Sequence, residues 1–134
     1  MKYLITITLC LSSFALFAQQ KQNQFILIVR SKATVKASPE LITTNVAHWQ
    51  EFMGDLGKSG KIVAGFRPGT GGLTLSGTKK VSKQSAYVAS GEVVSTILVI
   101  NAADMDEARL IAAQCPVYEL QGNVEIRPIK NSVN

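Results

Sequence analysis

Residues 25–30 read Phe-Ile-Leu-Ile-Val-Arg, and this stretch decides the fold. An unbroken apolar run rich in β-branched side chains predicts a β-strand. Because successive side chains of a strand point to opposite faces of a sheet, Phe25 and Leu27 share one face while Ile26 and Ile28 share the other. Both faces of this strand are therefore apolar, and both need to be covered.

A second strand of the same kind is predicted at residues 93–101. Two alternating sets of its positions are apolar: Val93, Ile97 and Val99, and Val94, Leu98 and Ile100. An antiparallel sheet with one solvated face would instead alternate apolar with polar residues. Burial of each such side chain is worth roughly 1.5–3 kcal/mol, and the chain has no spare element to cover the second face. We therefore expect a homodimer packed sheet to sheet.

Two amphipathic helices are predicted between the strands. Ser38, Pro39 and Glu40 have the order of a helix start, with a hydroxyl cap, a proline in the first turn and an acid beside it. One apolar helix face follows at helical spacing, formed by Ile42, Val46, Trp49, Met53 and Leu56. A capping box of Asp104 and Glu107 begins the second helix, whose apolar face reaches Cys115 before Pro116 ends it.

Further strands are predicted at residues 62–66 and 123–129, with a short hairpin in the polar, basic segment 73–88. The resulting order is β-α-β-β-α-β. This order predicts an α+β fold, a ferredoxin-like βαββαβ sandwich whose four-stranded antiparallel sheet carries two helices on one face.

The beginning of the chain has the layout of a signal peptide. Lys2 precedes an uncharged, mostly apolar run at residues 4–17, and Ala18 is followed by a polar stretch. The run is shorter than the roughly 20 residues of a membrane span. We interpret residues 1–18 as a signal peptide cleaved after Ala18, with a signal anchor as the alternative. Residues 19–24 are then a polar linker, 25–130 the domain and 131–134 a tail, in an exported protein of the periplasm or the extracellular space.

Composition narrows the possible functions. Hydrophobic residues make up 46% of the 134 residues and charged ones 17%, which fits one globular domain. The net charge of +5 is modest and no aromatic ladder accompanies it, so nucleic-acid binding is not expected. A single histidine without cysteine or carboxylate at ligand spacing argues against a structural metal site, and nothing predicts a cofactor. Cys115 is expected to be a buried structural thiol.

A few side chains are candidates for chemistry. His48, the only histidine, is a candidate general acid or base, with a structural role as the alternative. The span 58–83 holds six cations and no acid, so Arg67 and Lys80 are candidates for binding a carboxylate or phosphate; a solvated basic loop is the alternative. Arg30, Arg127 and Tyr87 are three further candidates for ligand binding. The alternative for the two arginines is a structural ion pair with Glu125 or Glu92.

Several short motifs follow one another in a recognisable order between residues 25 and 129. They are FILIVR at 25–30, SPE at 38–40, HWQEFM at 48–53, GKIVAG at 60–65, LSG at 75–77, DEA at 106–108, CP at 115–116 and VEIRPI at 124–129. In this order the chain resembles the YCII-related family, specifically its DGPF-domain branch. The resemblance implies a dimeric α/β-barrel made of ferredoxin-like subunits.

The Asp-Gly-Pro-Phe motif that gives this branch its name is not retained in the chain. The motif falls on Gln84-Ser85-Ala86-Tyr87, which keeps only the aromatic character. The resemblance also implies that His48 corresponds to the histidine of a His–Asp pair in some members. No carboxylate between Asp55 and Glu92 replaces the aspartate, so the family's acid/base residues are not intact.

The preferred interpretation is a homodimeric binding or accessory protein for a small, anionic molecule. Its pocket is expected between the first helix and the sheet, near residues 65–87. The alternative is a lyase or hydrolase acting on a small organic acid with His48 as general acid or base. A structural or protein-interaction module is the second alternative.

Overall fold

The computed structural model describes residues 22–130 of the chain. The predicted signal peptide, residues 1–18, and the tail, residues 131–134, lie outside the described residues. Strand β1 (Asn23–Lys32) begins two residues before the expected strand and takes up the end of the predicted linker. Within residues 22–130 no helix combines the length and apolar character needed to cross a membrane.

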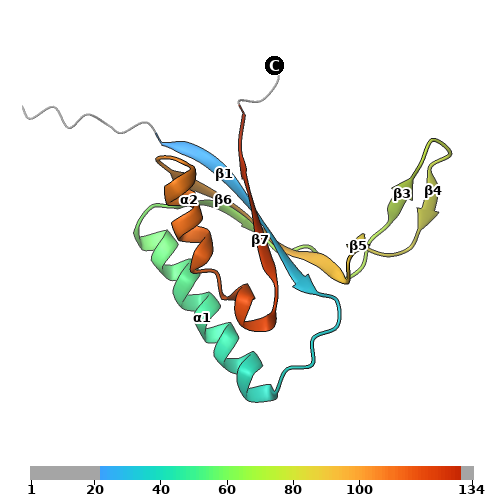
Figure 1. Cartoon of the computed structure of the whole chain (residues 1–134), viewed down its shortest axis with the longest axis horizontal. Coiled ribbons are helices and arrows are strands. Elements are labelled where there is room, and N and C mark those ends of the chain that lie inside the picture. Colours follow the sequence, from blue (N-terminus) through green and yellow to red (C-terminus); the bar gives the residue numbers. More distant parts are fainter. Residues whose placement is uncertain (1–21, 131–134) are drawn as a thin grey trace, which may run out of the picture.

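The sheet has the order and direction that a ferredoxin-like fold requires. Strands β2 (Ile62–Phe66), β6 (Glu92–Ala102), β1 and β7 (Asn123–Pro128) lie side by side in that order (Figure 1). Every neighbouring pair is antiparallel. A two-residue strand, β5 (Val88–Ala89), adds to the end of β6. The predicted α+β class and antiparallel sheet are confirmed; the four expected strands are present, and β5 is a fifth that the sequence did not predict.

Both predicted helices form, and both lie on the same side of the sheet (Figure 1). Helix α1 (Pro39–Lys58) begins where expected, because the Ser38 side chain accepts a hydrogen bond from the Leu41 N–H at 3.2 Å. Helix α2 (Met105–Ala113) is capped in the same way by Asp104, which accepts from the Glu107 N–H at 2.9 Å.

The hydrophobic core lies between these helices and the sheet. Strands β1 and β6 contribute its largest fully buried side chains, and the small alanines of α2 allow this helix to approach closely. The buried core residues are Phe25, Leu27, Val29, Phe52, Leu56, Leu98, Ile100, Ala102, Ala108, Ala112, Cys115 and Val117. The apolar face predicted for α1 is only partly correct: Phe52 belongs to the core, whereas Ile42 and Val46 are about half exposed.

The other face of the sheet is apolar and bears no helix. Ile28 pairs with Ile97 and Ile26 with Val99, and none of these side chains reaches full burial. Phe66 pairs with Ile97 from the other side and is 59% exposed. As predicted, both faces of these strands carry apolar side chains.

A β-bulge corrects the predicted alternation of β6. The register of β1 against β6 shifts between Val29, which faces Thr96, and Arg30, which faces Val94. Ser95 is the extra residue, so the alternation changes phase there. Val94, rather than Val93, therefore shares its face with Ile97.

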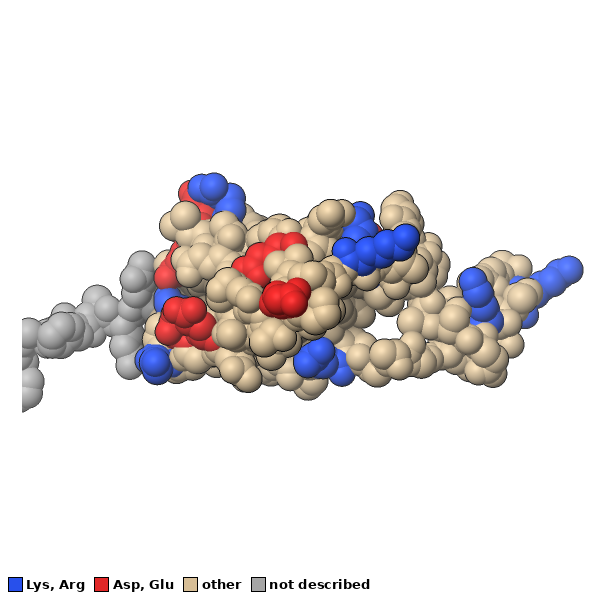
Figure 2. Space-filling model, turned by 90° about the horizontal axis from the view of Figure 1, so that it is seen from below, with Lys and Arg blue, Asp and Glu red and all other residues tan. Residues whose placement is uncertain are grey.

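The basic segment forms the expected short hairpin and stands away from the body. Strands β3 (Thr74–Ser76) and β4 (Val81–Lys83) make a separate two-stranded sheet, which we call the arm. Figure 1 shows the arm projecting beyond the end of the main sheet. Figure 2 shows its basic side chains standing apart from the acidic side chains of the body.

A short 3₁₀-helix that the sequence did not predict follows α2. The second helix was expected to extend to Cys115, but α2 ends at Ala113 and Pro116 begins the 3₁₀-helix η1 (Pro116–Leu120). Gln121 closes η1 in the left-handed conformation, with φ of 60°. The chain thereby turns sharply into β7.

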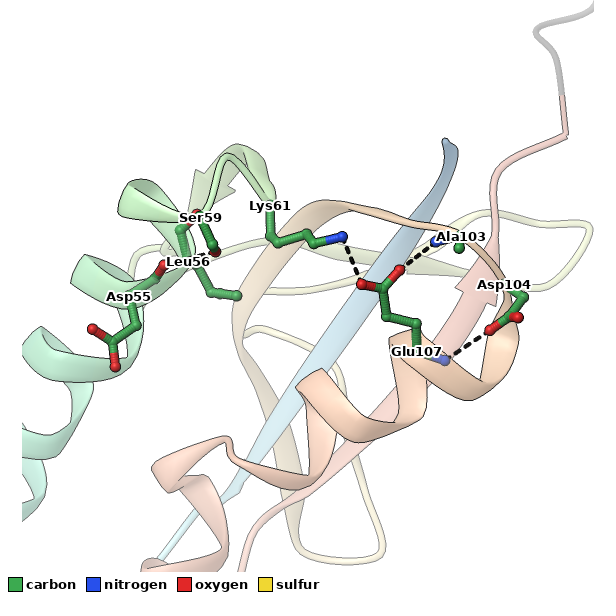
Figure 3. Close-up of polar contacts among 7 residues, drawn as sticks. All are labelled: Asp55, Leu56, Ser59, Lys61, Ala103, Asp104 and Glu107. Atoms are coloured by element: carbon green, nitrogen blue, oxygen red, sulfur yellow. Dashed lines mark hydrogen bonds and ion pairs between the residues drawn. The ribbon is translucent and has the colours of Figure 1, made fainter. Parts of the chain in front are cut away.

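An ion pair near the C-terminal end of α1 connects the segment before β2 to α2. Lys61, just after α1, donates to Glu107 of α2 at 2.6 Å (Figure 3). The other carboxylate oxygen of Glu107 accepts a hydrogen bond from the Ala103 N–H. Figure 3 shows these contacts beside the Asp104 cap. One half of the predicted capping box is confirmed, whereas the Glu107 side chain accepts from the Ala103 N–H instead of from the N–H of Asp104.

Candidate functional site

A cavity of about 580 Å³ lies between α1 and the sheet. This is where the sequence placed a pocket, and Gly65, Phe66 and Arg67 line it as expected. The complete wall consists of Ser31, Asn45, Val46, Trp49, Gln50, Met53, Gly65, Phe66, Arg67, Ser95, Thr96, Leu98, Val117 and Leu120.

The cavity exists because small residues meet α1 at this point. A Cβ atom on Gly65 would lie 3.2 Å from Leu98 Cδ2 and 3.6 Å from Met53 Cε, so a side chain there would crowd the wall. The bulge at Ser95, which also lines the cavity, interrupts the regular pairing at the neighbouring end of the sheet. The part of α1 from Asn45 to Met53 borders the cavity.

The sheet side of the wall is polar around the bulge. Ser31 Oγ donates to Ser95 Oγ at 2.7 Å, and Ser95 Oγ in turn donates to the Val29 carbonyl at 3.4 Å. This direction leaves the Ser31 oxygen free to accept a further hydrogen bond. Arg67 is the one charged side chain in the wall.

The helix side of the wall contains a buried amide that the sequence analysis missed. Asn45 is 4% exposed, and its Nδ2 donates to the Pro116 carbonyl at 2.8 Å and to Glu119 Oε2 at 2.9 Å. A signal for it was present in the sequence: a polar residue lies within the apolar stripe of α1, three residues after Ile42 and four before Trp49.

His48, one turn further along α1, has an acidic partner after all. Its Nδ1 lies 2.7 Å from Glu119 Oε1, while the other oxygen of the same carboxylate holds Asn45. The expectation that no carboxylate supports His48 was wrong, because its partner lies outside residues 55–92. Glu119 comes from η1, and no local pattern in the sequence connects it to α1.

The electrostatics of this pair define the roles of its atoms. The hydrogen bond from Asn45 above all, and then that from His48, lowers the pKa of Glu119. An ionised carboxylate only accepts hydrogen bonds, so Nδ1 of His48 carries the proton. In the neutral imidazole, Nε2 then has the free lone pair. Glu119 also lines a smaller cavity of about 310 Å³ together with Lys32 and Lys36.

The remaining predicted ligand-binding residues do not meet at the larger cavity. Arg30 pairs with Glu125 at 2.8 Å, and Arg127 lies 3.6 Å from the same carboxylate, which is the structural alternative left open by the sequence. Lys80 is on the turn of the arm, with φ of 51°, and Tyr87 is 70% exposed. Neither residue is part of the cavity wall.

The six cations of residues 58–83 likewise do not form one anion site. Lys61 is paired with Glu107, and Lys58 lies in the last turn of α1. Three lysines are on or beside the arm, and only Arg67 reaches the cavity. The basic side chains of residues 58–83 therefore lie on separate parts of the fold.

Two other expectations concern cysteine and metal. Cys115 is buried, and this burial raises the pKa of its thiol to about 11. Its predicted structural role is consistent with that environment. No group of three His, Cys, Asp or Glu side chains suited to a metal ion occurs within residues 22–130.

Comparison with known proteins gives one finding that covers nearly the whole chain. The family model described as the YCII-related domain matches residues 13–132, which include every helix and strand described above. The match begins within the segment predicted to be a signal peptide. No curated protein matches the chain.

Proposed function

This chain belongs to the YCII-related domain family, and we propose that it is a homodimeric binding protein for a small organic anion. The ligand occupies the cavity between α1 and the sheet, and its negative group pairs with Arg67. The homodimer forms through the apolar sheet face that bears no helix.

The cavity is the observation that carries this proposal. Its volume of about 580 Å³ is within the range of about 300–1,000 Å³ that small-molecule sites occupy. The wall is mostly apolar, with a few polar groups from both the sheet and α1 and no carboxylate. Arg67 makes no ion pair with any residue between 22 and 130, so its guanidinium is available to a carboxylate or phosphate.

The dimer is supported by the uncovered face of the sheet. Ile26, Ile28, Ile97 and Val99 form a continuous apolar surface in the register of β1 and β6. A contiguous apolar patch of this kind on a small domain marks an interaction site. A second copy supplies the same apolar surface, because a two-fold interface brings one patch against itself.

A thermal-shift experiment tests the binding proposal. The chain from Gln19 onward is melted with a panel of small carboxylates and phosphates. A ligand at 100 times its Kd stabilises the folded state by about 2.7 kcal/mol, a shift of several degrees for a domain of this size. We expect Arg67→Gln to abolish the shift.

Lys80→Gln is the matched control. It removes one positive charge from the arm, outside the cavity wall, and should retain the shift of the unmodified chain. Equal loss in both variants would point to nonspecific charge attraction. The absence of any shift over a broad panel would refute the binding proposal and favour a structural or protein-interaction module.

A second candidate function is favoured by the contact between His48 and Glu119. The 2.7 Å hydrogen bond orients the imidazole and leaves Nε2 as the basic atom, an arrangement suited to a lyase or hydrolase acting on a small organic acid. If any panel ligand is turned over, His48→Ala should lower the rate by at least about 100-fold. An unchanged rate in His48→Ala would exclude this chemistry.

Export remains part of the proposal and rests on the sequence alone. Lys2 and the uncharged run at residues 4–17 support it. Expression of the full chain in a bacterial host, followed by intact-mass measurement, tests it. A product starting at Gln19 in the periplasmic fraction is expected, whereas an uncleaved chain in the membrane fraction would indicate a signal anchor.

A further inference from the structure

We propose that the cavity selects anions that also carry a hydrogen-bond donor, and that Asn45 recognises this donor through Oδ1. The ligand class is a partly apolar carboxylate bearing a hydroxyl or amide N–H group. This inference rests on the proposed binding function and adds the group that determines which anions are accepted.

The orientation of the Asn45 amide is fixed by its partners. Both contacts of Nδ2 are to groups that only accept hydrogen bonds, the Pro116 carbonyl at 2.8 Å and Glu119 Oε2 at 2.9 Å. If the amide were rotated by 180°, its oxygen would face two other oxygens. The amide nitrogen of Asn45 therefore points to η1, and only Oδ1 is left to contact a ligand.

The remaining oxygen of Asn45 has no donor from the protein. No residue within 22–130 donates a hydrogen bond to Oδ1. The described part of the chain also contains no fully enclosed side-chain oxygen or nitrogen without a partner. Oδ1 must therefore retain accessible surface, and the cavity is the space that Asn45 lines. The cavity thus presents an acceptor that a ligand has to satisfy.

The rest of the wall defines the class of molecule. Ser31 Oγ is a second free acceptor, because its own proton is committed to Ser95. Trp49 and Met53 provide an apolar surface for the body of the ligand, and Arg67 is placed for its carboxylate. A ligand without a hydrogen-bond donor would displace water from Asn45 Oδ1 and leave this oxygen without a partner. The affinity for such a ligand is lower by about 10- to 100-fold.

A series of closely related probes tests the inference without changing the protein. Calorimetry on the protein expressed from the full-length chain gives the Kd of 3-phenylpropionate and of its 2-hydroxy, 3-hydroxy and 4′-hydroxy derivatives. The three positions allow for the unknown placement of the donor relative to the carboxylate. We expect at least one hydroxy derivative to bind about 10-fold or more tightly than the parent. Its methyl ether, which accepts but does not donate, should lose that gain.

Variants then assign the effect to one residue. Asn45→Leu keeps a similar volume but has no acceptor, so it should bind the hydroxy derivative and the parent equally. Arg67→Gln should weaken all members of the series by a similar factor. Circular dichroism verifies that each variant is folded, and the comparison within the unmodified protein stands even if Asn45→Leu does not fold.

The outcomes separate this inference from the function on which it rests. Equal affinity for the parent and every hydroxy derivative would overturn the role of Asn45 while leaving anion binding intact. Binding of donor-free panel carboxylates without binding of any hydroxy derivative would overturn it as well. Failure of the whole panel, these probes included, would instead refute the binding function itself.

Discussion

Glu119 Oε1 lies 2.7 Å from His48 Nδ1, although the two residues are 71 positions apart in the sequence. The contact depends on η1, which carries Glu119 back over α1. The same carboxylate holds Asn45 in the wall of the larger cavity. One acidic side chain thus fixes both the surface imidazole and the buried amide, and its position is decided by how η1 packs.

Gly122 is the residue that lets η1 pack in this way, and its substitution should be severe. A Cβ atom at Gly122 would collide with Val117 Cγ2 and with the Arg30 carbonyl oxygen, which belongs to the backbone and cannot move aside. We expect Gly122→Ala to lower the free energy of unfolding by about 3 kcal/mol or more. Denaturant unfolding measures this directly.

Gly54→Ala provides the matched control for that prediction. Gly54 lies inside α1, and an added Cβ atom would meet nothing within 4 Å. The same substitution should therefore raise stability there by roughly 0.5–1 kcal/mol, since alanine is the better helix former. A Gly122→Ala variant as stable as the unmodified chain would mean that η1 does not pack as described.

Glu107 should make stability depend on pH in the acid range. The hydrogen bond from Lys61, followed by that from the Ala103 N–H, holds the pKa of Glu107 below its ordinary value of 4.5. Glu107 therefore stabilises the fold at pH above 4.5, and this contribution is lost as the pH falls through the lowered pKa. Glu107→Gln should lower Tm at neutral pH and lose that difference in strong acid.

Exposed Glu51 on α1 is a suitable control for this titration. It makes no ion pair within the described part of the chain. The Tm of Glu51→Gln should follow the unmodified protein at every pH. A Glu107→Gln deficit that stays constant from neutral to acid pH would show that the effect does not come from the ionisation of Glu107.

The outer face of the sheet should control the oligomeric state. Ile97→Lys places a charge in the middle of the apolar surface shared by Ile28 and Val99. We expect this variant to be monomeric in light scattering coupled to size exclusion and the unmodified chain to be dimeric. Leu110→Lys, which changes a leucine 58% exposed on α2, should remain dimeric. A dimer that survives Ile97→Lys would place the interface elsewhere.

The thiol of Cys115 should be unreactive in the folded protein. It is 3% exposed, and burial raises its pKa to about 11, so little thiolate is present near neutral pH. In the chain from Gln19 onward, where Cys115 is the only cysteine, an aromatic disulfide reagent should react slowly until denaturant is added. Rapid reaction of the native protein would argue against the described packing of α2 on the sheet.

The elements of the fold were predictable because their signals are local. The Ser38 and Asp104 caps, the apolar runs of β1 and β6, and the hairpin of the arm each depend on residues a few positions apart. The order of these elements then favoured the ferredoxin-like sheet. The bulge at Ser95 was missed, because β6 is apolar on both faces and the phase change at the bulge depends on the register of the partner strand.

The sequence predicted where the cavity lies, and of the ligand-binding candidates only Arg67 lines it. The sequence by itself determined the amphipathic helix and the apolar strands, and the pocket was predicted between them near residues 65–87. Only the tertiary structure decided which side chains meet in it: Glu119 joins His48 and Asn45, while Arg30 and Arg127 are taken by Glu125 and Lys80 stands on the arm. The physical reason is the distance along the sequence over which each interaction acts. Caps and periodicity act between near neighbours, whereas a hydrogen bond across 71 residues depends on strand order, register and the turn after η1, which act together once the core has packed.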